Sequence, residues 1–462
     1  MPTLSPARCA TAAVILVASL LLAACPETRP RTPPPPHGTD TDLQRPQVDG
    51  EWTAQDETAL EALESAFAAR AEEGLATLDA AGTEPVASPL AGSRHRLRLH
   101  VFDVGQADAL LLIGPAPDFR TLLVDLGEPT RNSQLPPGLS SSALHVLDRI
   151  RTLTGRDEVD YFLATHYHSD HLGRGLGRAD GWGTGMIQLL SDFDVDFAVG
   201  TFIHVGDQGA EYMGDPNRRG VYTTVDRRMP VWQRYGRVGS SEAPRFGTGQ
   251  IDLGSGVDVD VLAFAGTVPG GDSAFQRVAN AGVDYTQTPG DENDLSIALE
   301  VSAGDFELFT AGDLNGTDDP VAHPLYVRRD WGQIYTNIEH HLVDHWRASA
   351  RESDVEVYRA NHHGSAYSST SRLLDALDPE LVLYSTGADH GHPSGGVVRR
   401  AGLTAEQLAT TAVRDPAAFS AAGGRQVGEI VISVAEDGRS YTVNGVPFEA
   451  FDDASEAAGD DE

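Results

Sequence analysis

Residues 159–175 read VDYFLATHYHSDHLGRG, an apolar run that is followed at once by His166, His168, Asp170 and His171. Neighbouring imidazoles repel each other once protonated and are costly to bury unpaired, so packing does not account for this cluster. Neutral imidazole and carboxylate are the usual nitrogen and oxygen ligands of zinc. Because side chains alternate along a strand, His166 and His168 project to the same side. The stretch therefore predicts a strand that ends in a metal site.

The same segment has ligands for two ions. Asp170 and His171 follow in the tight turn before Leu172, where the bending backbone can aim them at a second centre. Two-metal hydrolases hold their ions about 3.5–4 Å apart, so that a bridging hydroxide attacks while both ions stabilise the developing charge. We therefore expect a dinuclear centre. The alternative for this segment is a solvated polar turn.

Composition limits the classes of function. The chain has 462 residues and a formal net charge of −34, and every side-chain cation is an Arg or a His because lysine is absent. A length of this order allows a sizeable core or more than one domain. The acidic balance disfavours extended nucleic-acid binding, which draws its affinity from Lys and Arg on phosphates. It does not exclude a small anionic or ester substrate held by a metal.

The N-terminal residues 1–25 have the layout of an export signal, with Arg8, an apolar run from Ala12 to Leu22 and small residues before Cys25. The run is too short to span a membrane. Leu22-Ala23-Ala24-Cys25 is similar to a bacterial lipobox, in which the cysteine carries the lipid. We expect a lipoprotein anchored at the cell envelope through this lipid alone; the alternative is an ordinary secretory peptide. The chain's other cysteine, Cys9, lies inside the signal, so no disulfide is expected.

The remaining chain divides by composition. Residues 26–50 are Pro-rich and predict an extended tether, and 51–82 have apolar residues at helical spacing. From 94 to 450, short apolar or alternating runs interleave with helical stretches, which predicts a layered α/β domain. Residues 206–250 carry little pattern and are interpreted as an insertion or long loops. The end, 451–462, is an acidic tail that we expect to be disordered.

Several further motifs carry a resemblance to a known family. In chain order they are VFDVGQADALLL, LLVDLG, THYHSDHLG, ENDLSIAL, FTAGDL, NHHGSAYSS and HGHPS, and they cover Leu97 to about Pro393. Together they resemble the metallo-β-lactamase superfamily, and within it the soluble domain of DNA-internalisation competence proteins. The resemblance implies an αββα sandwich, in which two mixed β-sheets pack face to face with helices outside. It also implies a metal site on the shared edge of the sheets.

The same resemblance implies ligands beyond the opening motif. Asp313 would bridge the two ions, although an Asp that caps a turn is the alternative. His362 and His363 follow a strand; one should be a ligand and the other an outer group, and both remain candidates. His392, before Pro393, is the expected last ligand. The predicted metal ligands are His166, His168, Asp170, His171, Asp313, His362, His363 and His392, and the predicted catalytic residues are Asp170, Asp313 and Ser365.

Other polar residues receive weaker interpretations. Ser365 can present its hydroxyl or its N–H group to a substrate oxyanion, or simply form a turn. Asp103 and Asp125 are candidates for orienting a ligating histidine. His204 ends a strand at which other branches of the superfamily carry a ligand, but the branch resembled here does not. The histidines of HHLVDH, residues 340–345, lack the Glu of a zincin helix and predict a packed or solvated face.

These observations predict an exported metal-dependent hydrolase. Zinc is the expected metal, and manganese or iron suits similar ligands. The resemblance implies phosphodiester cleavage through a metal-bridging hydroxide. Two departures from the competence branch, Ala107 for a glycine and Ala366-Tyr367 where a lysine is usual, argue for a small substrate over long DNA. The alternatives are lactam, lactone or thioester hydrolysis on the same site, or a tethered binding lipoprotein without catalysis.

Overall fold

A computed structural model describes residues 90–450 of the chain apart from several gaps. The gaps are 91, 128–141, 173–185, 187–188, 191–194, 207–224, 227, 320–321, 330–331, 350, 352–353, 388–390, 404–406, 413–415 and 422–423. The predicted signal, tether, N-terminal helix and acidic tail therefore lie outside the described residues. No helix among the described residues is long and apolar enough to cross a membrane.

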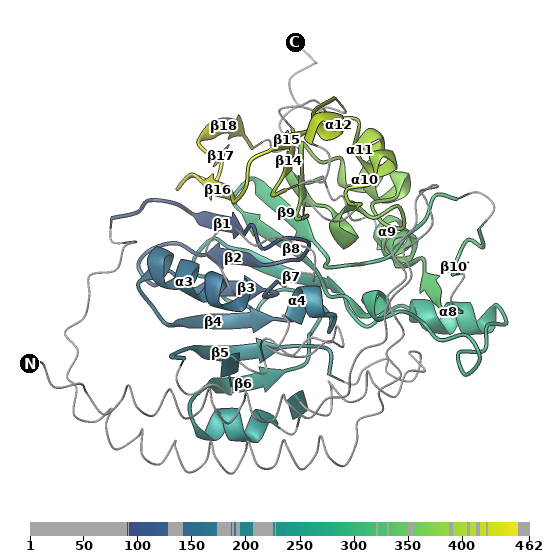
Figure 1. Cartoon of the computed structure of the whole chain (residues 1–462), viewed down its shortest axis with the longest axis horizontal. Helices are drawn as coiled ribbons and strands as arrows, with labels where there is room; N and C mark the ends of the chain where they lie inside the picture. Colours follow the sequence, from purple (N-terminus) through teal and green to yellow (C-terminus); the bar gives the residue numbers. More distant parts are fainter. Residues whose placement is uncertain are drawn as a thin grey trace, which may run out of the picture. The chain divides into compact units, whose positions relative to one another are not determined.

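Two mixed sheets form the domain (Figure 1). In spatial order the first contains β18 (Val446–Glu449), β17 (Ser440–Val443), β16 (Ile430–Val434), β1 (Leu97–Val101), β2 (Leu110–Ile113), β3 (Thr121–Val124), β4 (Glu158–Leu163), β5 (Ala198–Ile203) and β6 (Val238–Glu242). The second contains β15 (Arg425–Gln426), β14 (Leu408–Thr410), β13 (Leu381–Tyr384), β12 (Val357–Arg359), β9 (Phe306–Thr310), β8 (Ala298–Ala303) and β7 (Asp258–Ala263). A small hairpin pairs β10 (Tyr326–Arg328) with β11 (Ile334–Thr336).

Helices complete the layers. They are α3 (Ser142–Thr154), α4 (Ser169–Leu172), α8 (Ala274–Asn280), α9 (Ile338–Ser349), α10 (Ser371–Leu377), α11 (Gly395–Ala401) and α12 (Pro416–Ala421), with 3₁₀ turns η2 (Glu292–Leu295) and η3 (Asn361–Gly364). Helix α3 contributes its apolar face, including Val146 and Ile150, to the same core as the first sheet. Helices α9, α10 and α11 pack on the outer side of the second sheet.

The alternation of side chains explains how one strand serves two cores. On β13, Leu381 and Leu383 belong to the core that both sheets share, whereas Val382 and Tyr384 face the helices. Because successive side chains on a strand point to opposite faces, a strand covered on both sides is apolar throughout. The predicted αββα sandwich, with two packed mixed sheets and outer helices, is confirmed.

The region interpreted as an insertion, 206–250, contributes a strand to the first sheet. Strand β6 pairs in parallel with β5, for example Thr201 with Ser240. Its sequence, VGSSE, has small and polar residues without apolar alternation, which is why the pattern did not reveal an edge strand. Part of this region, 207–224 and 227, lies outside the described residues.

Candidate metal centre

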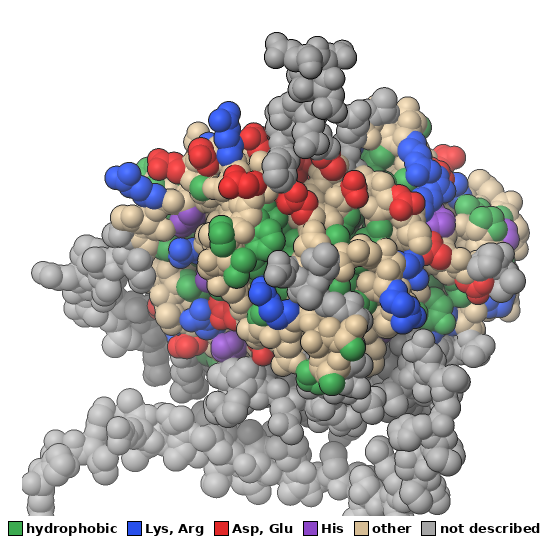
Figure 2. Space-filling view, turned by 90° about the horizontal axis from the view of Figure 1, so that it is seen from above, with side chains coloured by type: hydrophobic (Ala, Val, Ile, Leu, Met, Phe, Trp, Pro, Cys, Tyr) green, Lys and Arg blue, Asp and Glu red, His purple; other side chains and the backbone are tan. Residues whose placement is uncertain are grey.

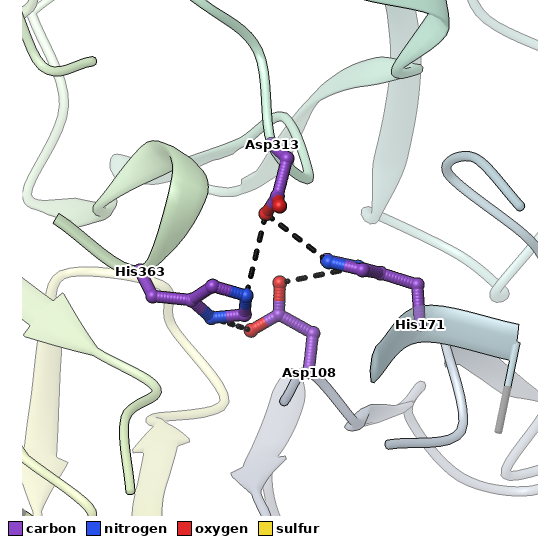
Figure 3. Close-up of side chains that lie close together, drawn as sticks. All are labelled: Asp108, His171, Asp313 and His363. Carbon is purple, nitrogen blue, oxygen red and sulfur yellow. Dashed lines mark ion pairs between the residues drawn. The ribbon is translucent and has the colours of Figure 1, made fainter. Parts of the chain in front are cut away.

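Four segments that are distant in sequence meet at one edge of the two sheets. His166, His168, Asp170 and His171 follow β4, and Asp313 follows β9. His362 and His363 lie in η3, directly after β12. Asp108 precedes β2 and joins them (Figure 3). Strand ends meet at this edge because β3, β4 and β5 run in parallel, as do β9, β12 and β13.

The first group of converging donor atoms consists of His166, His168 and Asp313. His166 Nε2 lies 3.0 Å from His168 Nδ1 and 3.9 Å from Asp313 Oδ2. His362 Nε2 approaches the same oxygen of Asp313 at 3.7 Å. The imidazoles of His166 and His362 therefore face one carboxylate oxygen, and His168 Nδ1 lies beside His166 Nε2.

The second group gathers around the other oxygen of the same carboxylate. Asp313 Oδ1 lies 3.1 Å from His171 Nε2 and 3.5 Å from His363 Nε2. His363 Nε2 is also 3.6 Å from Asp170 Oδ2. Asp313 thus stands between two sets of donors and turns one oxygen toward each. This is the placement that a bridging ligand requires.

The chemistry of the second group fits a cation. His171 Nε2, Asp313 Oδ1 and His363 Nε2 are buried and, apart from the ion pairs that they form with one another and with Asp170, find no hydrogen-bond partner among the described residues. Buried polar atoms are nearly always paired, so three orphaned atoms that point at one another need an explanation. Imidazole nitrogen and carboxylate oxygen are the donor types that divalent zinc, manganese or iron bind. The donor sets of both groups therefore fit divalent ions.

The outward-facing nitrogens of these histidines are occupied. His171 Nδ1 lies 2.8 Å from Asp125 Oδ2, and His363 Nδ1 lies 2.8 Å from the carbonyl oxygen of Ser385. Such acceptors hold the proton on Nδ1 and leave the Nε2 lone pair for a metal. Asp125 therefore has the orienting role that the sequence indicated.

Electrostatics keep Asp313 ionised. Burial alone would raise the pKa of Asp313, but His171, His363 and His362 outweigh it and bring the pKa well below its ordinary value. Burial likewise lowers the pKa of His171, but Asp313 and Asp125 outweigh it and raise the pKa well above its ordinary value. Without an ion the carboxylates therefore favour a second proton on His171, on the Nε2 atom that faces Asp313 Oδ1, and a metal ion would take the place of that proton. His166 is different, because burial is its largest influence and lowers its pKa well below the usual range. Asp313 is therefore available as an anionic ligand.

The backbone is strained where it delivers these groups. Asp125, His362 and His363 have φ values of 59°, 49° and 54°, in the left-handed region that side chains other than glycine seldom adopt. Gly312, with φ of 51°, allows a close approach, since a Cβ there would lie 2.6 Å from Thr165 Oγ1. Strain of this kind persists when surrounding contacts over-determine it, and it clusters at functional sites.

Buried carboxylates outside the centre hold its loops in place. Glu339 of α9 accepts hydrogen bonds from Asn361 Nδ2 at 2.9 Å, Ser369 N at 2.7 Å and Thr370 N at 2.8 Å, which pins both ends of the His362–His363 loop. Asp294 Oδ1 accepts from Asn315 Nδ2 at 2.8 Å. The Oδ1 atom of that amide then faces His362 Nδ1 at 3.2 Å. No local pattern in the sequence indicates these supporting contacts.

Two predicted site residues lie beside the converging atoms. The ring of His392 is 5.8 Å from that of His362 and 6.5 Å from that of His363, but His392 belongs to neither group of converging atoms among the described residues. Its role as a ligand stays a prediction. Ser365 is 1% exposed, and its hydroxyl accepts a long hydrogen bond from Tyr367 N at 3.4 Å. These contacts match the turn-forming alternative for Ser365.

The sequence interpretation missed Asp108 and favoured Asp103. The carboxylate of Asp103 accepts a hydrogen bond from the Gly105 backbone and interacts with Glu429, which lies elsewhere on the first sheet. Asp108 is the aspartate of the VFDVGQADA motif that reaches the centre. The available signal was the presence of two aspartates in one motif, but only the turn between β1 and β2 decides which one points inward.

The remaining histidines have other partners. His204 Nδ1 lies 2.5 Å from the Tyr167 hydroxyl, and its Nε2 lies 3.0 Å from Ser241 Oγ. His341 Nε2 lies 2.8 Å from the carbonyl oxygen of Asp272, and His340 Nδ1 lies 2.9 Å from Asn337 Nδ2. The contacts of His340 and His341 agree with the expectation of a packed or solvated helix face.

Comparisons with known proteins return likenesses of fold. No protein-family model matches the sequence, and no curated protein matches it significantly. Among solved structures, the chain is similar to CmlA, a diiron β-hydroxylase from Streptomyces venezuelae, with 13% identity, coverage of 70% of this chain and 52% of that one, and a TM-score of 0.32. It is also similar to the metallo-β-lactamase fold protein YhfI from Bacillus subtilis, with 9% identity, coverage of 62% of this chain and 84% of that one, and a TM-score of 0.29. A third similar structure is yeast PDE1, with 9% identity, coverage of 68% of this chain and 87% of that one, and a TM-score of 0.29.

The chain spans about half the length of CmlA. At these identities the likeness concerns the fold alone. The fold and the site together define an αββα protein with a buried His/Asp cluster that can hold metal.

Proposed function

We propose that this protein is a dinuclear metal-dependent hydrolase that cleaves a small phosphodiester. The observation that carries the proposal is Asp313, whose two carboxylate oxygens face two separate groups of donors. His166, His168 and His362 would hold one ion, and Asp170, His171 and His363 the other. Zinc is the proposed metal, with manganese or iron as alternatives for the same donors.

Bound ions would lower the pKa of a water molecule toward neutrality and stabilise negative charge on the substrate. The chain's own residues prepare that chemistry. Asp313 carries its negative charge in a buried position. Asp125 holds the ring of His171 by accepting a hydrogen bond from its Nδ1–H group. Glu339 and Asn315 fix the loop that carries His362. Groups held rigidly in this way have no reorganisation to undergo during the reaction.

A buried cation beside the centre supports an anionic substrate. The guanidinium carbon of Arg329 lies 3.8 Å from the ring centre of Tyr367 and 4.8 Å from that of Tyr335. The ring of Tyr335 lies 6.3 Å from that of His362. Tyrosine rings hold a guanidinium by cation–π attraction, and here they place the positive charge of Arg329 beside the centre, where it favours an anionic substrate.

Surface charge argues for a small substrate over a long nucleic acid. The formal net charge of −34 repels polyanions at long range. On the face drawn in Figure 2, acidic side chains are interspersed with the arginines. A phosphodiester or nucleotide that a single arginine and two ions can hold fits this distribution. The resemblance to competence proteins rests on sequence motifs and agrees with phosphodiester chemistry.

The test compares substrates on one preparation. Purified, zinc-loaded protein is assayed on a chromogenic phosphodiester, a chromogenic lactam and a lactone, and turnover of the phosphodiester is expected. Arg329→Gln should raise KM for the phosphodiester about tenfold or more, whereas the matched control Arg328→Gln, at an exposed neighbouring position, should leave KM unchanged. Turnover of the lactam or lactone alone would overturn the phosphodiesterase proposal. No more than a trace of bound metal would favour a non-catalytic binding lipoprotein.

We also propose that the protein is exported and anchored at the bacterial cell envelope by a lipid on Cys25. The support is the signal layout of residues 1–25 and the Pro-rich stretch that follows. Labelled palmitate should be incorporated into the wild-type protein and not into Cys25→Ser. A labelled Cys25→Ser variant, or an unlabelled wild type in a lipoprotein-processing host, would contradict the anchor.

A further inference from the structure

A buried ion pair lies next to the second group of donors. Arg359, the last residue of β12, is 0% exposed, and its Nη2 forms an ion pair with Asp108 Oδ2. Its Nη1 donates a hydrogen bond of 2.7 Å to the carbonyl oxygen of Gly312, the residue before Asp313. Arg359 therefore links the start of β2, the end of β9 and its own strand, three residues before His362.

Asp108 is close enough to compete as a ligand. Its carboxylate lies 3.5 Å from His171 Nδ1 and 3.6 Å from His363 Nδ1 (Figure 3). One of its oxygens falls within 4.8 Å of ligand atoms of His171, Asp313 and His363. Its backbone N–H also donates to the carbonyl oxygen of Asp170 at 3.0 Å. A free carboxylate in this position would be drawn to a cation bound by the second group.

The ion pair between Arg359 and Asp108 changes the net charge of the centre. Asp125, Asp170 and Asp313 bring three negative charges to the centre, and Asp108 is a fourth. Two divalent ions against three carboxylates leave one positive charge, which attracts an anionic substrate. Without the guanidinium, Asp108 would cancel that charge. Burial lowers the pKa of Arg359 to about 9, which still leaves it cationic at neutral pH.

We propose that Arg359 is a positioning residue that acts as a fixed counter-charge, holding Asp108 out of the ligand set and thereby setting how tightly the second ion binds. The inference rests on the proposed dinuclear centre. It predicts opposite changes in metal affinity when either partner of the ion pair is removed. A purely structural role predicts the same change for both. Loss of the arginine frees a carboxylate to attract the ion, whereas loss of the carboxylate leaves a bare cation that repels it.

The test titrates apo-protein with Co²⁺ and follows the visible absorption of the metal together with elemental analysis. Arg359→Gln should bind the second Co²⁺ about tenfold tighter or more, with an altered absorption spectrum, since the added charge acts at short range in a buried site. Asp108→Asn should bind it about tenfold weaker or more, for the same reason with opposite sign. Equal weakening in both variants, with an unchanged spectrum, would show a structural role and overturn the inference.

Further variants keep the test decisive. Arg359→Lys retains the charge and should keep the wild-type affinity, and the double variant Asp108→Asn/Arg359→Gln is neutral and should return toward it. As a matched control, Arg351→Gln removes an arginine that pairs with Asp260 and Glu300 elsewhere on the second sheet, and it should not change Co²⁺ binding. If Arg359→Gln does not fold, Asp108→Asn and Arg359→Lys decide: the first must weaken binding and the second must not.

The two proposals fail in different ways. A wild-type protein that takes up fewer than two Co²⁺ ions contradicts the dinuclear centre itself. A wild type that binds two ions, with a double variant as weak as Asp108→Asn alone, contradicts only the role of Arg359.

Discussion

The two sheets have the same strand topology, but the residues that follow their equivalent strands have different roles at the centre. In each, two antiparallel pairings are followed by parallel strands: β1 to β3 and then β4 to β6 in the first, β7 to β9 and then β12 to β14 in the second. An aspartate follows β3 and another follows β9, and histidines follow β4 and β12. Equivalent strand ends therefore carry similar residues toward the same edge.

The two aspartates differ in what satisfies them. Asp125 accepts hydrogen bonds from Thr165 N at 2.8 Å and Thr165 Oγ1 at 2.7 Å, and it lies 2.8 Å from His171 Nδ1. Asp313 Oδ1 has ion pairs with His171 and His363 but accepts no hydrogen bond from a backbone N–H or hydroxyl group among the described residues. A carboxylate saturated by protein donors can orient a ligand, while one left unsaturated among imidazoles is available to cations. Donor saturation, more than position, separates the ligand from the orienting group.

The largest expected effect tests that distinction directly. Asp313→Asn should remove both ions and lower phosphodiesterase kcat by about a thousandfold or more, because a bridging charge is lost. Asp125→Asn should retain both ions, with metal affinity or activity reduced about 10–100-fold. Elemental analysis and steady-state kinetics measure both. Equal losses in the two variants would contradict the assignment of separate roles.

The next largest effect is a loss of one ion, which distinguishes the two donor groups. His362→Ala and His363→Ala should each lose one ion, so that the metal content falls from two per chain toward one. Because His362 Nε2 faces Asp313 Oδ2 and His363 Nε2 faces Oδ1, the remaining ion should have a different Co²⁺ spectrum in the two variants. Identical spectra would mean that the neighbouring histidines serve the same ion.

Strand β12 allows a comparison of its two ends. At the end opposite the centre, the pKa of Glu356 is raised from an ordinary 4.5 to about 8, chiefly by burial, with smaller contributions from the neighbouring carboxyl groups of Glu380 and Glu307. The folded state then binds a proton that the unfolded state has released, so the free energy of unfolding falls as pH rises from 4.5 to 8. Glu356→Gln should flatten this slope and stabilise the protein by about 2 kcal/mol at pH 8.

Urea unfolding at several pH values measures this effect. The activity of Glu356→Gln should stay at the wild-type level, since its side chain lies away from the donor groups. A pH slope that persists unchanged in Glu356→Gln would contradict the assignment to this carboxyl group. Glu307, whose pKa burial raises to about 7, accounts for the part of the slope that remains.

The smallest effect is expected at His204. Its contacts are with the Tyr167 hydroxyl and Ser241 Oγ, outside both donor groups. His204→Gln should keep two ions per chain and lose about 1 kcal/mol of stability, the usual contribution of a hydrogen bond. Loss of an ion in this variant would show that His204 is a metal ligand.

Part of this centre could be predicted from the sequence because four of its candidate ligands lie within six residues of one another. The spacing of His166, His168, Asp170 and His171 after an apolar run specifies both the strand end and the metal chemistry. The sequence does not show which of His362 and His363 faces an ion. Both residues adopt left-handed backbone conformations, so their rings point to different oxygens of Asp313. Alternation rules for strands and helices do not cover two such residues in succession.

The residues that support the centre could not be predicted from local sequence patterns for a related reason. Asp108, Glu339 and Asp294 act through contacts between segments that are far apart in sequence, and each looks like an ordinary acidic residue in its own surroundings. Strand β6 was missed because VGSSE lacks any periodic apolar pattern. Local patterns predict the ligands and the layers, whereas the buried charges that hold them require the tertiary fold.

Anomalous X-ray scattering from crystals of the zinc-loaded protein tests the central claim most directly. The account predicts two strong peaks, one within coordinating distance of each carboxylate oxygen of Asp313. A single peak, or two peaks that do not share Asp313, would contradict it.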